Sequence, residues 1–130
     1  MMQYSLLDRR PEEWFQMIEQ ADASVVSRGT IAKGLLSYEW KNRLTHNGYE
    51  TYSAEALEQL LAELEAAYGN LQAVALAFNL NNTAIASTVI GASSSEQLNG
   101  TIAAYELSQE LVDLSLVEQR TVAARYTNHR

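Results

Sequence analysis

The feature that most constrains this chain is an alternation of short apolar segments with segments that carry helical signals. The candidate strands are Met1–Leu7, Ser24–Ser27 and Ala84–Ile90, and a helical stretch follows each of them. Strands that alternate with helices pair in parallel through right-handed crossovers. The sequence therefore predicts an α/β fold with a parallel sheet.

Capping residues and apolar periodicity locate the helices between and after these strands. Proline suits a first helical position, serine and asparagine suit N-caps, and glycine suits the residue after a helix, as at Gly69. The predicted helices run from Pro11 to about Ala21, Ser53 to Tyr68, Asn70 to about Asn81, Ser94 to about Glu106, and from Ser108 onward. Ser94 and Gln97 have the spacing of a capping box.

Two helices carry specific expectations of burial. The first should bury an apolar stripe, and the last should bury its aliphatic side chains. These are Trp14, Phe15, Met17 and Ile18 in the first helix, and Leu111, Leu114, Val117 and Val122 in the last. The stretch from Ser37 to Thr51 has no clear period, which indicates a long, mobile excursion.

A three-stranded parallel sheet is small, and its first strand opens the chain. Parallel sheets normally need cover on both faces. A partner or missing neighbouring strands is therefore expected. This is the pattern of a fragment.

Composition narrows the class of protein. A length of 130 residues suits one domain. The net charge of −7 disfavours binding to nucleic acid or anionic lipid, because both are negatively charged. Cysteine is absent, and His46 and His129 lie far apart, so no metal site is expected. Neither a signal peptide nor an apolar run long enough to span a membrane is visible. We expect a cytoplasmic protein.

Two segments could bind a ligand, because both follow predicted strands at the carboxyl ends where α/β folds bind ligands. They are Gly29–Gly34 and Gly91–Gln97. The second opens a helix with three serines, a combination that suits a phosphate group. Simple helix capping is the commoner role of such serines, and no G-x-G-x-x-G or Walker lysine loop is present.

Three motifs, in order, resemble the aldo/keto reductase family. YSLLDRRPE at Tyr4–Glu12 resembles its sixth strand and the following turn, and RGTIAKGLL at Arg28–Leu36 resembles its loop after the seventh strand. VIGASSSEQL at Val89–Leu98 resembles its eighth-strand motif. The resemblance implies a partial (β/α)8 TIM barrel. Residues 1–130 would be a C-terminal fragment, with the last three βα units and a helical C-terminal extension.

The resemblance also implies how the first glycine segment would bind NADP. In the family this loop crosses the cofactor pyrophosphate, largely through main-chain atoms, which here belong to Gly29, Ile31 and Lys33. An aromatic residue that stacks on the nicotinamide often stands where this chain has Arg28, and a guanidinium can stack on a flat ring as well. Thr30 replaces the usual proline. For the two charged side chains, a solvated position on a loop remains the alternative.

The second segment corresponds to the family's site for the adenosine 2′-phosphate, which gives NADP preference. By resemblance this role falls to Gly91, Ser93, Ser94 and Gln97. Thr101 stands where an asparagine often contacts the adenine, and the neighbouring Gly100 replaces an acidic residue. These departures predict weakened adenine binding.

No catalytic residue is expected in this chain. The family reduces carbonyl groups with NADPH, using a tyrosine acid with a lysine, an aspartate and a histidine from the first four βα units. This chain resembles the family only from the sixth strand onward, and Lys33 and Lys41 do not match the catalytic lysine. The resemblance also suggests that Met1 is an internal methionine of a longer family sequence.

Three hypotheses follow from these expectations. The chain could be an inactive fragment of an NADPH-dependent oxidoreductase. It could be a non-catalytic nucleotide-binding or self-associating half-barrel module, in the latter case a homo-oligomer. It could also gain activity through a separately encoded N-terminal half that complements it.

Overall fold

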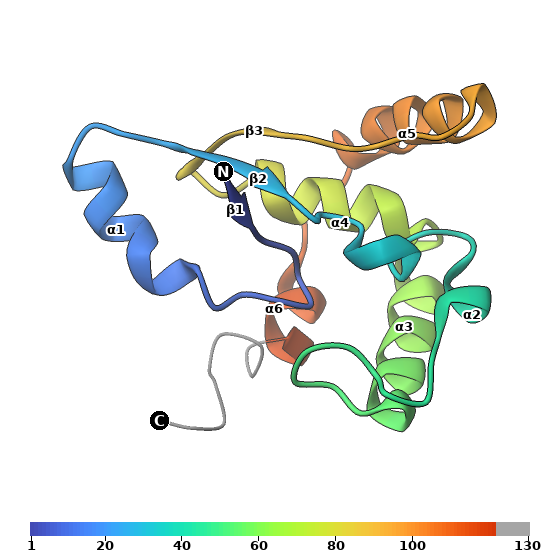
Figure 1. Cartoon of the computed structure of the whole chain (residues 1–130). Coiled ribbons are helices and arrows are strands. Elements are labelled where there is room, and N and C mark those ends of the chain that lie inside the picture. Colours follow the sequence, from blue (N-terminus) through green and yellow to red (C-terminus); the bar gives the residue numbers. More distant parts are fainter. Residues whose placement is uncertain (122–130) are drawn as a thin grey trace.

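The strands form a parallel sheet in the order β1 (Met2–Gln3), β2 (Val25–Arg28) and β3 (Ile85–Thr88), as the computed structural model in Figure 1 shows. The structure describes residues 1–121. The parallel α/β arrangement expected from the sequence is confirmed. The first and third strands are shorter than predicted, whereas the second has the predicted length and begins one residue later. After β1 the chain turns at Ser5, whose amide and carbonyl both bond to Asp8.

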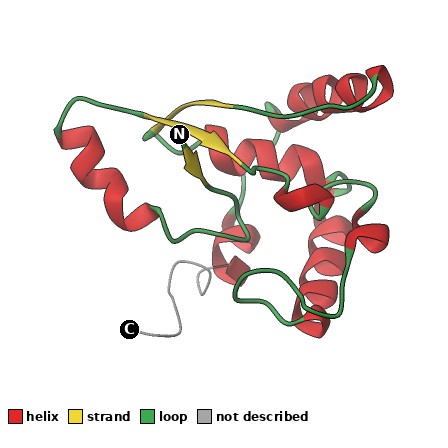
Figure 2. Ribbon diagram, in the orientation of Figure 1, coloured by secondary structure: helices red, strands yellow, loops and turns green. Residues whose placement is uncertain are grey.

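Helices follow each strand, as Figure 2 shows. Their bounds are α1 (Glu12–Gln20), α2 (Trp40–Arg43), α3 (Ala54–Tyr68), α4 (Leu71–Leu80), α5 (Ser95–Ser108) and α6 (Ser115–Thr121), with a 3-10 turn η1 at Ala32–Gly34. The predicted caps of α3 and α4 are confirmed, because Ser53 accepts from the Ala56 amide and Asn70 from the Ala73 amide. Gly69 ends α3 at a φ of 86°.

Two expectations for the helices are wrong. The last helix begins at Ser115 rather than Ser108, because Ser108 continues α5 and donates its hydroxyl to the Tyr105 carbonyl. In α1 only Phe15 is buried, whereas Trp14 and Met17 are about half exposed. In α6 Val117 is buried as expected, and Val122 lies outside the described residues.

The stretch after η1 is less irregular than its sequence suggested. It contains the short helix α2, whose Trp40 is buried and donates its indole N–H to Glu65 of α3. This contact holds the stretch against α3 (Figure 1).

The sheet is buried on the face that contacts α4. Nearly every residue of α4 is buried, and Val25 and Ser27 of β2 point toward this side. The other face carries Val26, Arg28 and Ser87, all exposed among the described residues. Parallel sheets normally have both faces covered, but the described residues cover only the face that contacts α4.

Candidate functional site

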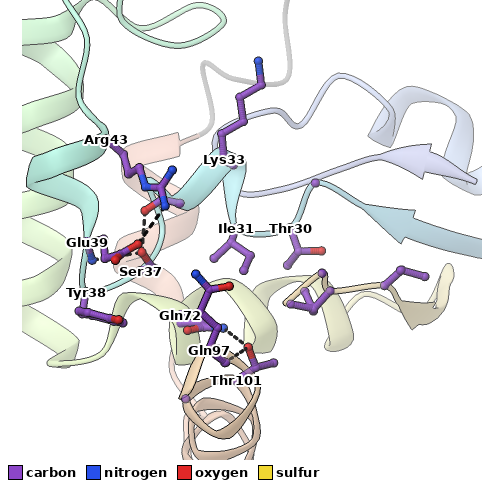
Figure 3. Close-up of a pocket in the computed structure, with 17 residues that line it drawn as sticks. Thr30, Ile31, Lys33, Ser37, Tyr38, Glu39, Arg43, Gln72, Gln97 and Thr101 are labelled. Carbon is purple, nitrogen blue, oxygen red and sulfur yellow. Dashed lines mark hydrogen bonds and ion pairs between the residues drawn. The ribbon is translucent and has the colours of Figure 1, made fainter. Parts of the chain in front are cut away.

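A cavity of about 370 Å³ lies at the carboxyl ends of β2 and β3 (Figure 3). One wall is the loop from Gly29 to Gly34, and the other is formed by the segment after β3 together with α5. Residues of the stretch after η1 close one end. Both glycine-containing segments singled out in the sequence therefore meet at one hollow.

The first wall is a tight loop with an unusual backbone. Gly29 and Gly34 have φ values of 70° and 89°, and Ala32 and Lys33 also lie in the left-handed region. Such conformations cost L-residues about 1–2 kcal/mol each, and they cluster at ligand-binding sites. A side chain at Gly29 would also meet Gln3 at 3.1 Å. Glycine here keeps the main chain open to a ligand.

The second wall begins at the N-terminus of α5. Ser94 accepts from the Gln97 amide at 3.1 Å, which confirms the predicted cap. The Gln97 side chain returns to Ser93 instead of Ser94, accepting from its amide at 2.8 Å and its hydroxyl at 2.9 Å. These hydrogen bonds connect the residues before α5 to its first turn.

A buried polar network joins the two walls. The Asn79 amide of α4 donates to the Tyr4 carbonyl at 3.0 Å, to Ser27 Oγ at 3.0 Å and to Thr30 Oγ1 at 3.1 Å. Thr88, at the end of β3, contacts Ser27 at 2.8 Å and Thr30 at 2.5 Å. The network ties the start of the Gly29–Gly34 loop to the strand that leads into the second wall.

Charged side chains at the cavity come from the loop and from α2. Arg43 Nη2 lies 3.1 Å from Glu39 Oε2, and both side chains are partly exposed. The Lys33 side chain extends away from the other labelled residues in Figure 3. Of the two cationic residues among the described lining residues, Arg43 is therefore the one whose side chain lies along the cavity wall.

The structure brings most of the predicted site residues together. Those that line the cavity are Gly29, Ile31, Lys33, Gly91, Gln97 and Thr101. Ser93 and Ser94 are exposed at the start of α5, next to the lining residues. Arg28 lies on the uncovered face of the sheet, where it donates to Gln3 at 3.4 Å.

Sequence reasoning missed several residues that line the cavity. They are Ser37, Tyr38, Glu39, Arg43 and Gln72. Gln72 of α4 donates to Thr101 Oγ1 at 2.8 Å, which links α4 to the second wall. The first four come from the aperiodic stretch, and their position depends on the buried Trp40. A buried tryptophan in an otherwise polar stretch was the available signal.

Three tyrosines that are fully or partly buried have raised pKa values. Burial, followed by the hydrogen bond to the Glu12 carboxylate, raises the pKa of Tyr4 far above its usual value. Burial also raises the pKa of Tyr49 to about 12, and that of Tyr52 above its ordinary value. None of the three lines the described cavity. The described residues also contain no cluster of potential metal ligands.

A glycine-containing loop and a helix N-terminus that meet at the carboxyl edge of a parallel sheet define an α/β protein with a cavity at its strand ends, where such folds bind ligands. The model of the aldo/keto reductase family matches residues 1–115. The chain belongs to the aldo/keto reductase family.

Individual relatives agree with this assignment. The uncharacterized oxidoreductase YqkF of Bacillus subtilis (strain 168) is 37% identical over 139 residues, covering 100% of this chain and 45% of YqkF. The aldo-keto reductase AKR11C1 from Bacillus halodurans superposes with a TM-score of 0.76 in its apo form at 31% identity and 0.74 in its holo form at 34%. Either form covers 99% of this chain, which spans 44% of AKR11C1. The chain thus spans less than half the length of these relatives. None of its described helices is long and apolar enough to cross a membrane.

Proposed function

We propose that this chain carries the NADP-binding part of an aldo/keto reductase, formed by the last three βα units of the barrel and a helical extension. The observation that supports the proposal best is the cavity between the Gly29–Gly34 loop and the start of α5. A volume of about 370 Å³ suits part of a dinucleotide.

Each wall suits one part of NADP. The main chain at Gly29, Ile31 and Lys33 would contact the pyrophosphate, since these three residues line the cavity. Arg28, next to Gly29 in the chain, would stack on the nicotinamide from the uncovered face of the sheet.

The N-terminus of α5 suits the 2′-phosphate. Unpaired amides and the helix dipole favour an anion at that end of a 14-residue helix. Gly91, Ser93, Ser94 and Gln97 would surround the phosphate, and Thr101 would lie near the adenine. The Ser93–Gln97 and Ser94–Gln97 hydrogen bonds keep this segment in one conformation before binding.

We further propose that the chain alone does not reduce carbonyl compounds. When bound, NADPH supplies hydride, but the reaction also needs an acid to protonate the carbonyl oxygen. No part of the sequence matches the family's catalytic motif, and Tyr4, Tyr49 and Tyr52 lie outside the cavity lining. The catalytic tyrosine and its partners would lie outside these 130 residues.

Fluorescence titration of the 130-residue chain with NADPH and NADH tests this function. We expect NADPH to bind more tightly, and Ser94→Ala to weaken NADPH binding more than NADH binding. Gln109→Ala, exposed just after the other end of α5 and outside the cavity lining, should change neither. If neither dinucleotide binds at millimolar concentration, the proposed NADP binding is refuted. If the chain alone reduces a carbonyl compound, the proposal that it lacks this activity is refuted.

A second candidate function is association with another chain. The face of α5 that carries Leu98, Ile102 and Tyr105 is about half exposed, and the sheet has an uncovered face among the described residues. A second copy of the chain or a complementing N-terminal half would cover such surfaces. In this case the chain serves as a half-barrel module whose activity depends on its partner.

A further inference from the structure

The Arg43 guanidinium at the cavity is paired with the Glu39 carboxylate, which a bound anion could replace. We propose that Arg43 binds the diphosphate bridge of a dinucleotide, and that Glu39 pairs with its guanidinium until the diphosphate takes that place. The inference rests on the proposed dinucleotide function and names a binding residue that the sequence did not reveal.

Arg43 lies directly against the Gly29–Gly34 loop. Its side-chain stem packs on Gly34, where an added Cβ atom would lie 3.1 Å from both Cγ and Nε of Arg43. Gly34 has a φ of 89° and ends the 3-10 turn of the loop. The absence of a side chain at this glycine lets the arginine lie on the main chain. The loop that would cross the diphosphate thus carries a guanidinium on its surface.

The charge at the cavity favours Arg43 as the anion-binding residue. Among the described residues that line the cavity, the ionised side chains are those of Lys33, Glu39 and Arg43. Lys33 extends away from the others in Figure 3. A diphosphate needs positive charge and geometric fit, and the planar guanidinium supplies both through paired N–H donors. Arg43 is better placed than Lys33 to supply them.

The pair between Arg43 and Glu39 is weak enough to exchange. The two side chains meet through one hydrogen bond at 3.1 Å, and they are 49% and 33% exposed. A solvent-exposed ion pair of this spacing shifts an equilibrium by only about twofold. A doubly charged diphosphate can therefore displace the Glu39 carboxylate, with little loss when the pair opens.

The two partners should respond in opposite directions if this is correct. Arg43→Met removes the cation and should weaken binding about tenfold or more, as expected for a charged hydrogen-bonding group. Glu39→Gln removes the carboxylate that competes with the diphosphate for Arg43. It should strengthen dinucleotide binding about twofold, which is the effect expected of an exposed ion pair. A merely structural pair would lose binding with either variant. In the double variant the gain from Glu39→Gln should vanish.

Fluorescence titrations of the 130-residue chain with NADPH and NADH test the inference. Because the two dinucleotides share the diphosphate, Arg43→Met should weaken both by the same factor. Lys41→Met is the control, since Lys41 lies over the Trp40 ring and outside the cavity lining. Urea unfolding checks that each variant folds.

Each outcome separates the two proposals. If the wild-type chain binds both dinucleotides but Arg43→Met binds them equally well, only the role of Arg43 is refuted. A loss confined to NADPH would assign Arg43 to the 2′-phosphate and overturn the diphosphate assignment. A wild-type chain that binds neither dinucleotide refutes the proposed function and this inference together.

Discussion

At the scale of single residues, Asn79 links three segments next to the cavity, and no sequence motif predicted this role. It is fully buried, and its amide bonds to three oxygens from the end of β1, from β2 and from the loop. Asn79→Ala would leave the Tyr4 carbonyl without this donor and open a small cavity. We expect the free energy of unfolding in urea to fall by about 2–4 kcal/mol.

The control for this prediction is Asn81→Ala, two residues later and exposed. That change should alter the free energy of unfolding by less than about 0.5 kcal/mol. Equal losses in the two variants would show that the buried network has no special role.

Residues that belong to local motifs were predictable, and residues brought in by long-range packing were not. The Gly29–Gly34 loop and the Ser94 cap follow from strand ends and capping rules. Arg43 reaches the loop because Trp40 is buried against α3, and a tryptophan in a polar stretch indicates burial without indicating what it packs against. Side chains alternate along β2, and Val25 and Ser27 point to the buried face. Arg28 therefore points to the uncovered face, which depends on how the sheet packs on α4.

At the scale of elements, the helices with clear caps were the predictable ones. In α3, α4 and α5 a serine or asparagine binds the amide three residues on, a purely local interaction. The start of α6 was missed because Ser108 is an equally plausible cap. In the structure its hydroxyl bonds within α5, and Asp113 accepts from the Ser115 amide instead.

Arg9 holds several elements together and supports a second prediction. It is buried, and it contacts Glu12 at 2.7 Å, Glu118 at 2.8 Å and Thr121 at 3.1 Å. Burial lowers the pKa of Arg9, but the Glu12 and Glu118 carboxylates outweigh this effect and raise it, so the guanidinium stays charged. Arg9→Met should lower the free energy of unfolding by about 3–5 kcal/mol, measured by urea denaturation.

Arg120→Met is the matched control, because it removes a pair of similar length at the surface of α6. Arg120 lies 2.8 Å from Glu63, but both side chains are more than 40% exposed. Its loss should cost less than about 1 kcal/mol. If Arg120→Met destabilised the protein as much as Arg9→Met, burial of Arg9 would not be the reason for its importance.

At the scale of the whole molecule, parallel pairing follows from the alternation of strands and helices, and both strand pairs are parallel. The expectation that a sheet this small lacks cover agrees with the exposed Val26 and Ser87. Local patterns do not specify what covers that face, because the identity of a partner depends on surfaces that belong to another molecule or to another part of the barrel.

The exposed apolar surface makes self-association the last prediction. Leu98, Ile102 and Tyr105 form a stripe on α5, since residues three and four apart share a helix face. Contiguous exposed apolar surface of this kind marks an interaction site. The net charge of −7 opposes association of two copies, so salt should favour it by screening their repulsion. Sedimentation should therefore show a concentration-dependent dimer that becomes more abundant as ionic strength rises.

A pair of double variants separates the apolar stripe from charge. Leu98→Glu with Ile102→Glu should abolish the dimer at all salt concentrations, because the added carboxylates would be buried in the contact. Asn99→Glu with Ala103→Glu adds the same charge to exposed positions of the same helix and keeps the stripe. In high salt, where added charge is screened, this control should still dimerise. A wild-type chain that stays monomeric throughout, or a control that fails like the stripe variant, would rule out α5 as the contact.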